Sequence, residues 1–193
     1  MRKKVKVIDK PSLKIHIDCN HLTVGELGNI LIRLQAALRS IAGLSPGEYD
    51  GRYSREQPRF ITSSINTGYS IDIAIILAIL SLAASMPDAI NNWMRITTEI
   101  FRRFKIALLA MVRGEIESED NNIEAEGLRI EVTRGKIDLE ASRPFLDELS
   151  PATRKALGNL IWSLTGPSRK VNIGDEESEI SLQWPEDDEE EKF

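Results

Sequence analysis

Apolar residues near the start of the chain follow two different periods, which predict a strand and then a helix. Residues 5–18 alternate in part, which predicts one strand or two short strands separated at Pro11. Residues 23–43 carry an apolar stripe with helical spacing. Thr23 and Glu26 stand three positions apart at the start of that stripe. This spacing is typical of a capping box and predicts where the helix begins.

The middle of the chain combines a hairpin pattern with an almost wholly apolar run. Residues 60–75 alternate on both sides of an Asn-Thr-Gly turn, which predicts a β-hairpin. The apolar run at 73–84 fits a central strand that enters a buried helix, a self-association surface, or an element lying on a membrane. It is too short to span a bilayer as a helix, and we favour the first two alternatives. Residues 88–112 return to helical spacing and predict a long helix.

The last third of the chain predicts two more hairpins and one more helix. Residues 128–139 alternate around a turn at 133–136, which predicts a second hairpin. Ser150, followed by a proline, predicts the start of a third helix, and Gly166 predicts its end. Residues 171–182 predict the last hairpin.

Together these elements predict an α+β protein with a mainly antiparallel sheet, built from hairpins and packed with three helices, one of them long. We expect a single domain over residues 1–184, with a candidate sub-boundary at the acidic loop 114–122. Two of the predicted helices are each followed by a hairpin, which suggests an internal structural repeat.

The net charge of the chain conceals two parts of opposite sign. The 193 residues include 25 basic and 30 acidic ones, which gives −5. Residues 174–193 hold ten acidic residues and one lysine, or −9, so residues 1–173 are +4. We expect residues 185–193 to form a disordered acidic tail, because such a segment cannot bury a core. The basic part is either a polyanion-binding face that the tail shields, or ordinary solvated surface.

The two histidines and the single cysteine fall close together, at His16, Cys19 and His21. These residue types can bind zinc, and a cysteine near a histidine can act as a nucleophile. Their spacing fits no short zinc motif, and no second cluster supplies further ligands. We therefore expect no metal, no cofactor and no catalytic residue. A small metal-binding or cysteine-dependent enzyme remains an alternative.

The cysteine count and the N-terminus indicate a compartment. A single cysteine excludes an intrachain disulfide and favours reducing surroundings. The first residues are basic, but no apolar run follows them, so they do not fit a secretory signal. We expect the protein to be cytoplasmic.

Aromatic and arginine side chains mark the candidate interaction sites. The polar loop 44–58 interleaves the two types, which suits either stacking on single-stranded nucleic acid or a protein-binding hot spot. Residues 102–105 of the predicted long helix, Arg-Arg-Phe-Lys, can contact phosphates. The interaction candidates are Tyr49, Arg52, Tyr53, Arg55, Trp93, Arg102, Arg103 and Phe193.

Two segments resemble parts of known proteins. The acidic tail with its terminal Phe193 resembles the C-terminal tip of single-stranded-DNA-binding proteins, which implies recruitment of partner proteins. The rest of the chain is too helical for the oligonucleotide-binding barrel of that family. Residues 128–140, preceded by an apolar hairpin and helix, are similar to small companion proteins of bacterial or phage conflict systems. That resemblance implies an adaptor.

These patterns favour a non-enzymatic interaction or adaptor protein that self-associates or joins a larger assembly. A protein partner, a homo-oligomer or both are expected. The alternative is a nucleic-acid-associated protein with a basic N-terminal face and an acidic regulatory tail. Peripheral membrane contact is the least favoured partnership, because the only membrane-like segment is the run at 73–84.

Overall fold

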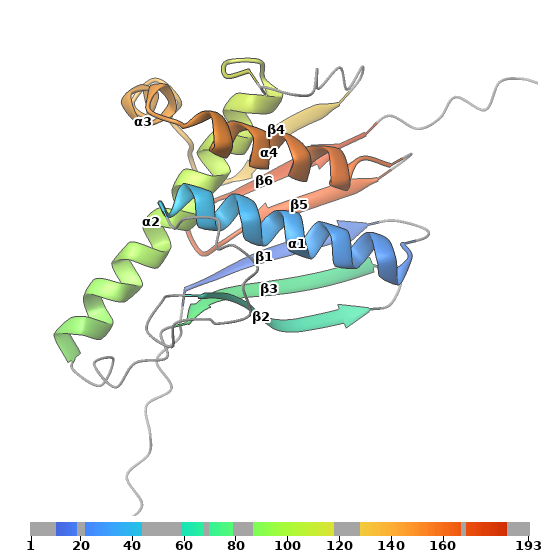
Figure 1. The fold of residues 1–193 in the computed structure, drawn as a ribbon, viewed down its shortest axis with the longest axis horizontal. Coiled ribbons are helices and arrows are strands. Elements are labelled where there is room, and N and C mark those ends of the chain that lie inside the picture. Colours follow the sequence, from blue (N-terminus) through green and yellow to red (C-terminus); the bar gives the residue numbers. More distant parts are fainter. Residues whose placement is uncertain are drawn as a thin grey trace, which may run out of the picture.

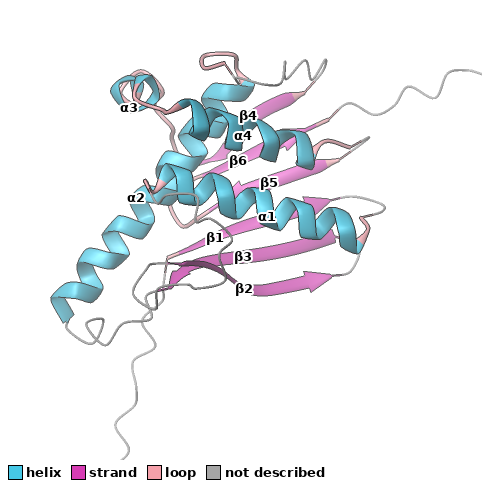
Figure 2. Cartoon of the chain, in the orientation of Figure 1, coloured by secondary structure: helices cyan, strands magenta, loops and turns pink. Residues whose placement is uncertain are grey.

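Six strands form one sheet in the order β2-β3-β1-β5-β6-β4, and every pairing is antiparallel (Figures 1 and 2). This computed structural model describes residues 11–18, 22–43, 59–67, 70–78, 87–117, 128–166 and 169–184. The strands are β1 (Ser12–Asp18), β2 (Arg59–Thr67), β3 (Ser70–Ala78), β4 (Arg129–Arg134), β5 (Lys170–Gly174) and β6 (Glu179–Gln183). The helices are α1 (Val24–Ile41), α2 (Pro87–Val112), α3 (Arg143–Asp147) and α4 (Pro151–Leu164). The predicted α+β class is confirmed.

One face of the sheet is apolar and buried, because side chains alternate along each strand. In β1, the residues Leu13, Ile15 and Ile17 are buried, whereas Lys14 and Asp18 are exposed. The helices α1 and α4 cover the apolar face (Figure 1). The buried side chains of the strands and of the helices form one core cluster. The opposite face of the sheet carries polar side chains and is not covered by a helix of the described chain.

Side-chain caps fix the start of the two helices that lie side by side on the sheet. At α1, Glu26 N donates to Thr23 Oγ1 at 3.2 Å, and Thr23 N donates to Glu26 Oε2 at 2.7 Å. This is the predicted capping box. At α4, Thr153 N donates to Ser150 Oγ at 3.2 Å. Thr153 Oγ1 also lies 2.8 Å from Ser40 Oγ, so the start of α4 is tied to the end of α1.

The C-terminal half of the long helix α2 packs on the core. Phe101, Phe104 and Leu108 are fully buried there. The N-terminal half projects beyond one end of the sheet (Figure 1). Polar and apolar side chains therefore stay accessible to solvent along one side of α2. This exposed side forms part of the candidate site.

The two halves of the sheet share an element order but have opposite hands. In both β1-α1-β2-β3 and β4-α4-β5-β6, the last strand lies between the other two. β1 and β4 run in opposite directions, because β1, β5, β6 and β4 are successive antiparallel neighbours. Since α1 and α4 cover the same face, the two crossovers have opposite hands. No rotation superposes one half of the sheet on the other. The suggested internal repeat therefore extends only to the order of the elements.

The predicted second hairpin is wrong. Residues 129–134 do form strand β4, but residues 137–139 do not return beside it. β4 pairs instead with β6, with Val132 opposite Ile180. The alternation and the turn residues indicated local pairing, whereas β4 pairs at long range with β6, whose Ile180 and Leu182 are fully buried. The segment that follows β4 is irregular and leads into the short helix α3, which the sequence pattern did not predict.

The apolar run at 73–84 is a core strand as far as the structure describes it. Its residues up to 78 belong to β3, which lies between β2 and β1 and contributes buried Ile73 and Ile75. Within the described segments, no helix is long and apolar enough to cross a membrane. Strands from both sides of the candidate boundary at 114–122 belong to the same sheet. The acidic tail 185–193 lies outside the described residues.

Candidate functional site

The structure places only some of the candidate residues. Arg102 and Arg103 lie on α2 with exposed side chains. Trp93 is also in α2, but its side chain lies outside the described set. His16 lies on β1. The candidates that fall outside the described residues are Cys19, His21, Tyr49, Arg52, Tyr53, Arg55 and Phe193.

His16 lies on the polar face of the sheet and pairs with Asp72 of β3. The His16 Nδ1 atom is 2.6 Å from Asp72 Oδ1, and the two residues are directly opposite in register. An ionised carboxylate only accepts, so the imidazole Nδ1–H donates. Asp72 is exposed, between buried Ile71 and Ile73. Among the residues that the structure describes, no three histidine, cysteine or carboxylate side chains are grouped to hold a metal ion.

A buried ionic cluster ties α2 to the turn between β5 and β6. Lys105 of α2 is 0% exposed and donates from Nζ to Asp175 Oδ1 at 2.5 Å. The same Nζ donates to Ser178 Oγ at 2.6 Å and to Ser178 O at 3.0 Å. Asp175 Oδ1 also accepts from the backbone N–H groups of Glu177 and Ser178, each at 3.0 Å. The expectation that Lys105 contacts phosphates is therefore wrong.

The cluster contains a serine and a lysine, the residue types of a catalytic dyad. In such a dyad the lysine must be neutral, which this arrangement does not favour. A general base must be neutral to take a proton. Burial lowers the pKa of Lys105, and the hydrogen bond to Asp175 opposes this shift. The three acceptors, one of them the Asp175 carboxylate, match the three N–H donors of an ammonium. Ser178 Oγ accepts from this ammonium and is not activated by it. The arrangement stabilises the turn and does not support nucleophilic catalysis.

The chain packs tightly around the same turn. Arg134 Nη2, at the end of β4, donates to the backbone carbonyl of Asp175. Gly135 follows with φ +74°, and a Cβ at this position would lie 2.2 Å from Glu177 O. The predicted hairpin turn thus uses its glycine to approach the β5–β6 turn. This contact directs the following segment back towards α2.

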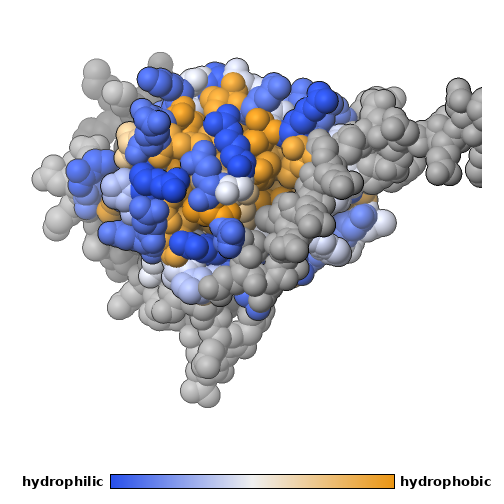
Figure 3. Space-filling view, turned by 90° about the horizontal axis from the view of Figure 1, so that it is seen from above, coloured by the Kyte–Doolittle hydropathy of each residue, from blue (hydrophilic) through white to orange (hydrophobic). Residues whose placement is uncertain are grey.

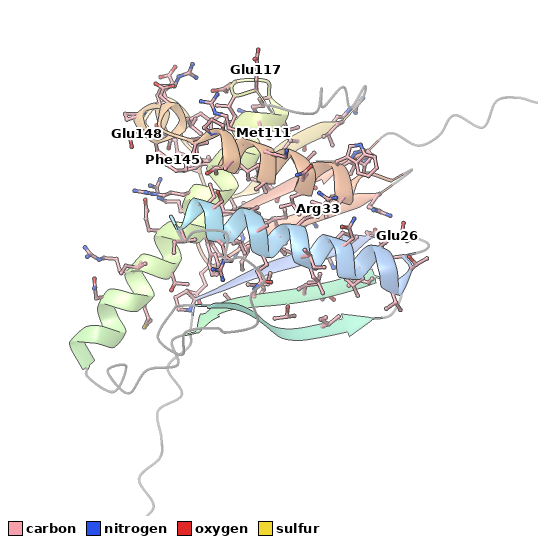
Figure 4. All side chains as sticks on the ribbon, in the orientation of Figure 1. Glu26, Arg33, Met111, Glu117, Phe145 and Glu148 are labelled. Carbon is pink, nitrogen blue, oxygen red and sulfur yellow. The ribbon has the colours of Figure 1, made fainter. Side chains whose placement is uncertain are left out.

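A cavity of about 540 Å³ opens between that segment, α2 and the β5–β6 turn. α2 contributes Arg102, Arg103 and buried Ile106 to its lining. Ile137 and Phe145 add apolar surface from the segment that contains α3. Figure 4 shows Phe145 and Glu148 beside α2. The charged side chains of this lining are Arg102, Arg103, Lys136, Asp138, Glu148 and Glu177.

A second cavity of about 730 Å³ continues along α2 towards its projecting half. The two cavities share Arg102, Arg103 and Glu177, and we call the continuous feature the α2 groove. The second cavity adds Ile96, which is 38% exposed, and the charged residues Arg95 and Glu99. The α2 groove is therefore lined by four basic residues, Arg95, Arg102, Arg103 and Lys136, and by four acidic residues, Glu99, Asp138, Glu148 and Glu177.

Glu99 positions the two central arginines of the groove. It accepts from Arg102 Nε and Nη2, both at 2.8 Å, and from Arg103 Nε at 2.7 Å. The hydrogen bond from Arg102 is the main reason why the pKa of Glu99 lies below its usual value. The guanidinium of Arg103 lies 5.2 Å from the centre of the Phe145 ring, within cation–π range. These contacts hold two charged side chains in fixed places at the centre of the groove.

Apolar side chains are also exposed outside the groove. Val24 at the start of α1 is 88% exposed, Ile32 of α1 is 57% exposed, and Trp162 of α4 is 65% exposed. Figure 3 shows the molecule from the side of α3 and β4, where apolar surface is interrupted by charged side chains. Because the helix layer also exposes apolar residues, experiments on the groove need a control there.

Comparisons with known proteins find no relative of this chain. No protein-family model matches the chain, and searches of curated proteins and of solved structures find no match.

Proposed function

We propose that the protein is a non-enzymatic interaction protein, an adaptor or assembly component, that binds a protein partner in the α2 groove. The observation that carries the proposal is the lining of the groove. Ile96, Ile106 and Phe145 supply apolar surface, and Arg102 and Arg103 lie among them. Arginine and aromatic residues are enriched where proteins bind proteins, and energetically important contacts cluster in such pockets.

The balance of charge in the groove favours a protein over a polyanion. Nucleic acid is bound by a surplus of basic side chains that neutralise phosphates. Here the groove has as many acidic residues as basic ones. Glu99 already accepts hydrogen bonds from three nitrogen atoms of Arg102 and Arg103. A protein segment that carries both signs and an apolar side chain fits this lining better.

Peptide display tests the proposal without a known partner. Random peptides are selected on the wild-type protein and then tested on Arg103→Glu, which reverses a charge at the centre of the groove. We expect selected peptides to carry apolar and charged residues of both signs, and to bind Arg103→Glu at least about tenfold more weakly, as for a central interface residue. Binding is measured by fluorescence anisotropy.

The matched control for that experiment is Arg129→Glu. Arg129 is exposed on β4 and does not line the groove, so this variant makes the same charge change elsewhere. Peptides that bind both variants as well as the wild type would refute the groove as the site. A selection that enriches nothing, together with tight binding of a labelled oligonucleotide at low salt, would favour the nucleic-acid alternative instead.

A further inference from the structure

We infer that the partner in the α2 groove is a second copy of this chain, related by a two-fold axis. The inference rests on the proposed function and names its partner. In a two-fold interface the same patch lies on both sides, so it must be complementary to itself. A patch of one sign would repel its copy. The four basic and four acidic residues of the groove satisfy this requirement.

The groove also offers an exposed apolar side chain and a cavity that can receive its copy. Ile96 is exposed on the projecting part of α2, and the cavity lined by Ile106 and Phe145 lies further along the same helix. Ile96 and Ile106 are ten residues apart, which is about 15 Å along a helix. A two-fold axis midway between them brings two α2 helices together in antiparallel directions. It places Ile96 of each copy against the cavity of the other.

The same axis brings opposite charges together at both ends of the interface. Arg95 lies next to Ile96, and Glu148 lies beside the cavity that accepts it. Both residues are exposed, and the Arg95 guanidinium donates to Asn92 Oδ1 at 3.1 Å. The Glu148 backbone N–H donates to Leu146 O, and no described residue makes a hydrogen bond or ion pair with its carboxylate. Each copy therefore offers Arg95 to Glu148 of the other, and this pair forms twice.

Two other occupants fit less well. The acidic segment 186–191 of the same chain would meet as many carboxylates as basic groups in the groove. The apolar residues on α1 and α4, with Trp162 as the largest, form a competing surface for self-association. Glu26 of α1 and Lys155 of α4 are exposed on that layer as well, so charge alone does not exclude it. A test must separate that surface from the groove.

A charge-swap experiment by analytical ultracentrifugation tests the inference. We expect the wild-type chain to sediment as a dimer. The variants Arg95→Glu and Glu148→Arg should each raise the dimer dissociation constant by about tenfold or more, because each places like charges together twice. An equimolar mixture of the two variants should regain most of the affinity, because both pairs again have opposite signs. Ile96→Asp should dissociate the dimer, and Trp162→Ala should not.

Each alternative outcome overturns the inference in a recognisable way. A wild-type chain that stays monomeric at high concentration excludes the second copy, while peptide display still decides the proposed function on its own. A dimer that Trp162→Ala dissociates, and that Arg95→Glu leaves intact, places the interface on the helix layer. A mixture that associates no better than either variant alone excludes the two-fold pairing. Circular dichroism of every variant shows whether it remains folded.

Discussion

Replacing Lys105 with methionine is expected to destabilise the protein by about 3–5 kcal/mol, the usual cost of removing one partner from a buried ion pair. Methionine retains most of the volume of the side chain but leaves Asp175 as a buried carboxylate without its ammonium. Asp175 Oδ1 would keep only its two backbone N–H donors, and Asp175 Oδ2 has no hydrogen-bond partner among the described residues. Urea denaturation followed by circular dichroism measures the loss.

Lys136→Met is the matched control for that substitution. Lys136 is exposed at the rim of the α2 groove, and the same change there should alter the free energy of unfolding by less than about 0.5 kcal/mol. The double variant Lys105→Met with Asp175→Asn should lose less than the sum of the two single losses, because the charges are coupled. If Lys105→Met unfolds at the same urea concentration as the wild type, the cluster is not a stabilising element.

Gly135→Ala should have the second large effect. Gly135 has φ +74°, so any other residue is strained there by about 1–2 kcal/mol. Its new Cβ would also lie 2.2 Å from Glu177 O and 2.9 Å from Ser178 Cα. Because these are backbone atoms, the turn must move, which adds about 1–3 kcal/mol. The same movement displaces the acceptors of Lys105. Thermal denaturation followed by circular dichroism measures the combined loss.

Gly114→Ala separates the two causes. Gly114 has φ +73°, but beyond its chain neighbours no described residue has an atom within 4 Å of the Cβ that it would gain. This variant should therefore show the backbone strain alone. Equal losses at Gly114 and Gly135 would mean that the close approach to the β5–β6 turn contributes nothing.

Local patterns predicted most of the elements. The capping box of Thr23 and Glu26 set the start of α1, and Ser150 set the start of α4, because caps involve residues only a few positions apart. The hairpins β2-β3 and β5-β6 were confirmed for the same reason. The prediction at residues 137–139 was wrong because β4 pairs with β6, which lies far along the chain. The alternation of apolar residues predicts which face of a strand is buried, but it does not predict which other strand pairs with it.

The candidate site was only partly predictable. Arg102 and Arg103 were chosen for their charge, and both line the α2 groove. The other wall of the groove was missed, because residues 137–139 were predicted as a strand. The burial of Lys105 was also missed, although its position was informative. It lies four residues after Phe101 and three before Leu108, on the buried side of the helix. Its partner Asp175 is 70 residues away in a turn.

Nuclear magnetic resonance on the unmodified protein at increasing concentration tests most directly where it associates. The account predicts that backbone amides of residues 136–148 and the Nε–H groups of Arg102 and Arg103 shift as the protein is concentrated. The indole N–H of Trp162 and the amide of Arg129 should keep their positions. A shifting Trp162 indole with an unchanged groove, or a spectrum that does not depend on concentration, would contradict the account.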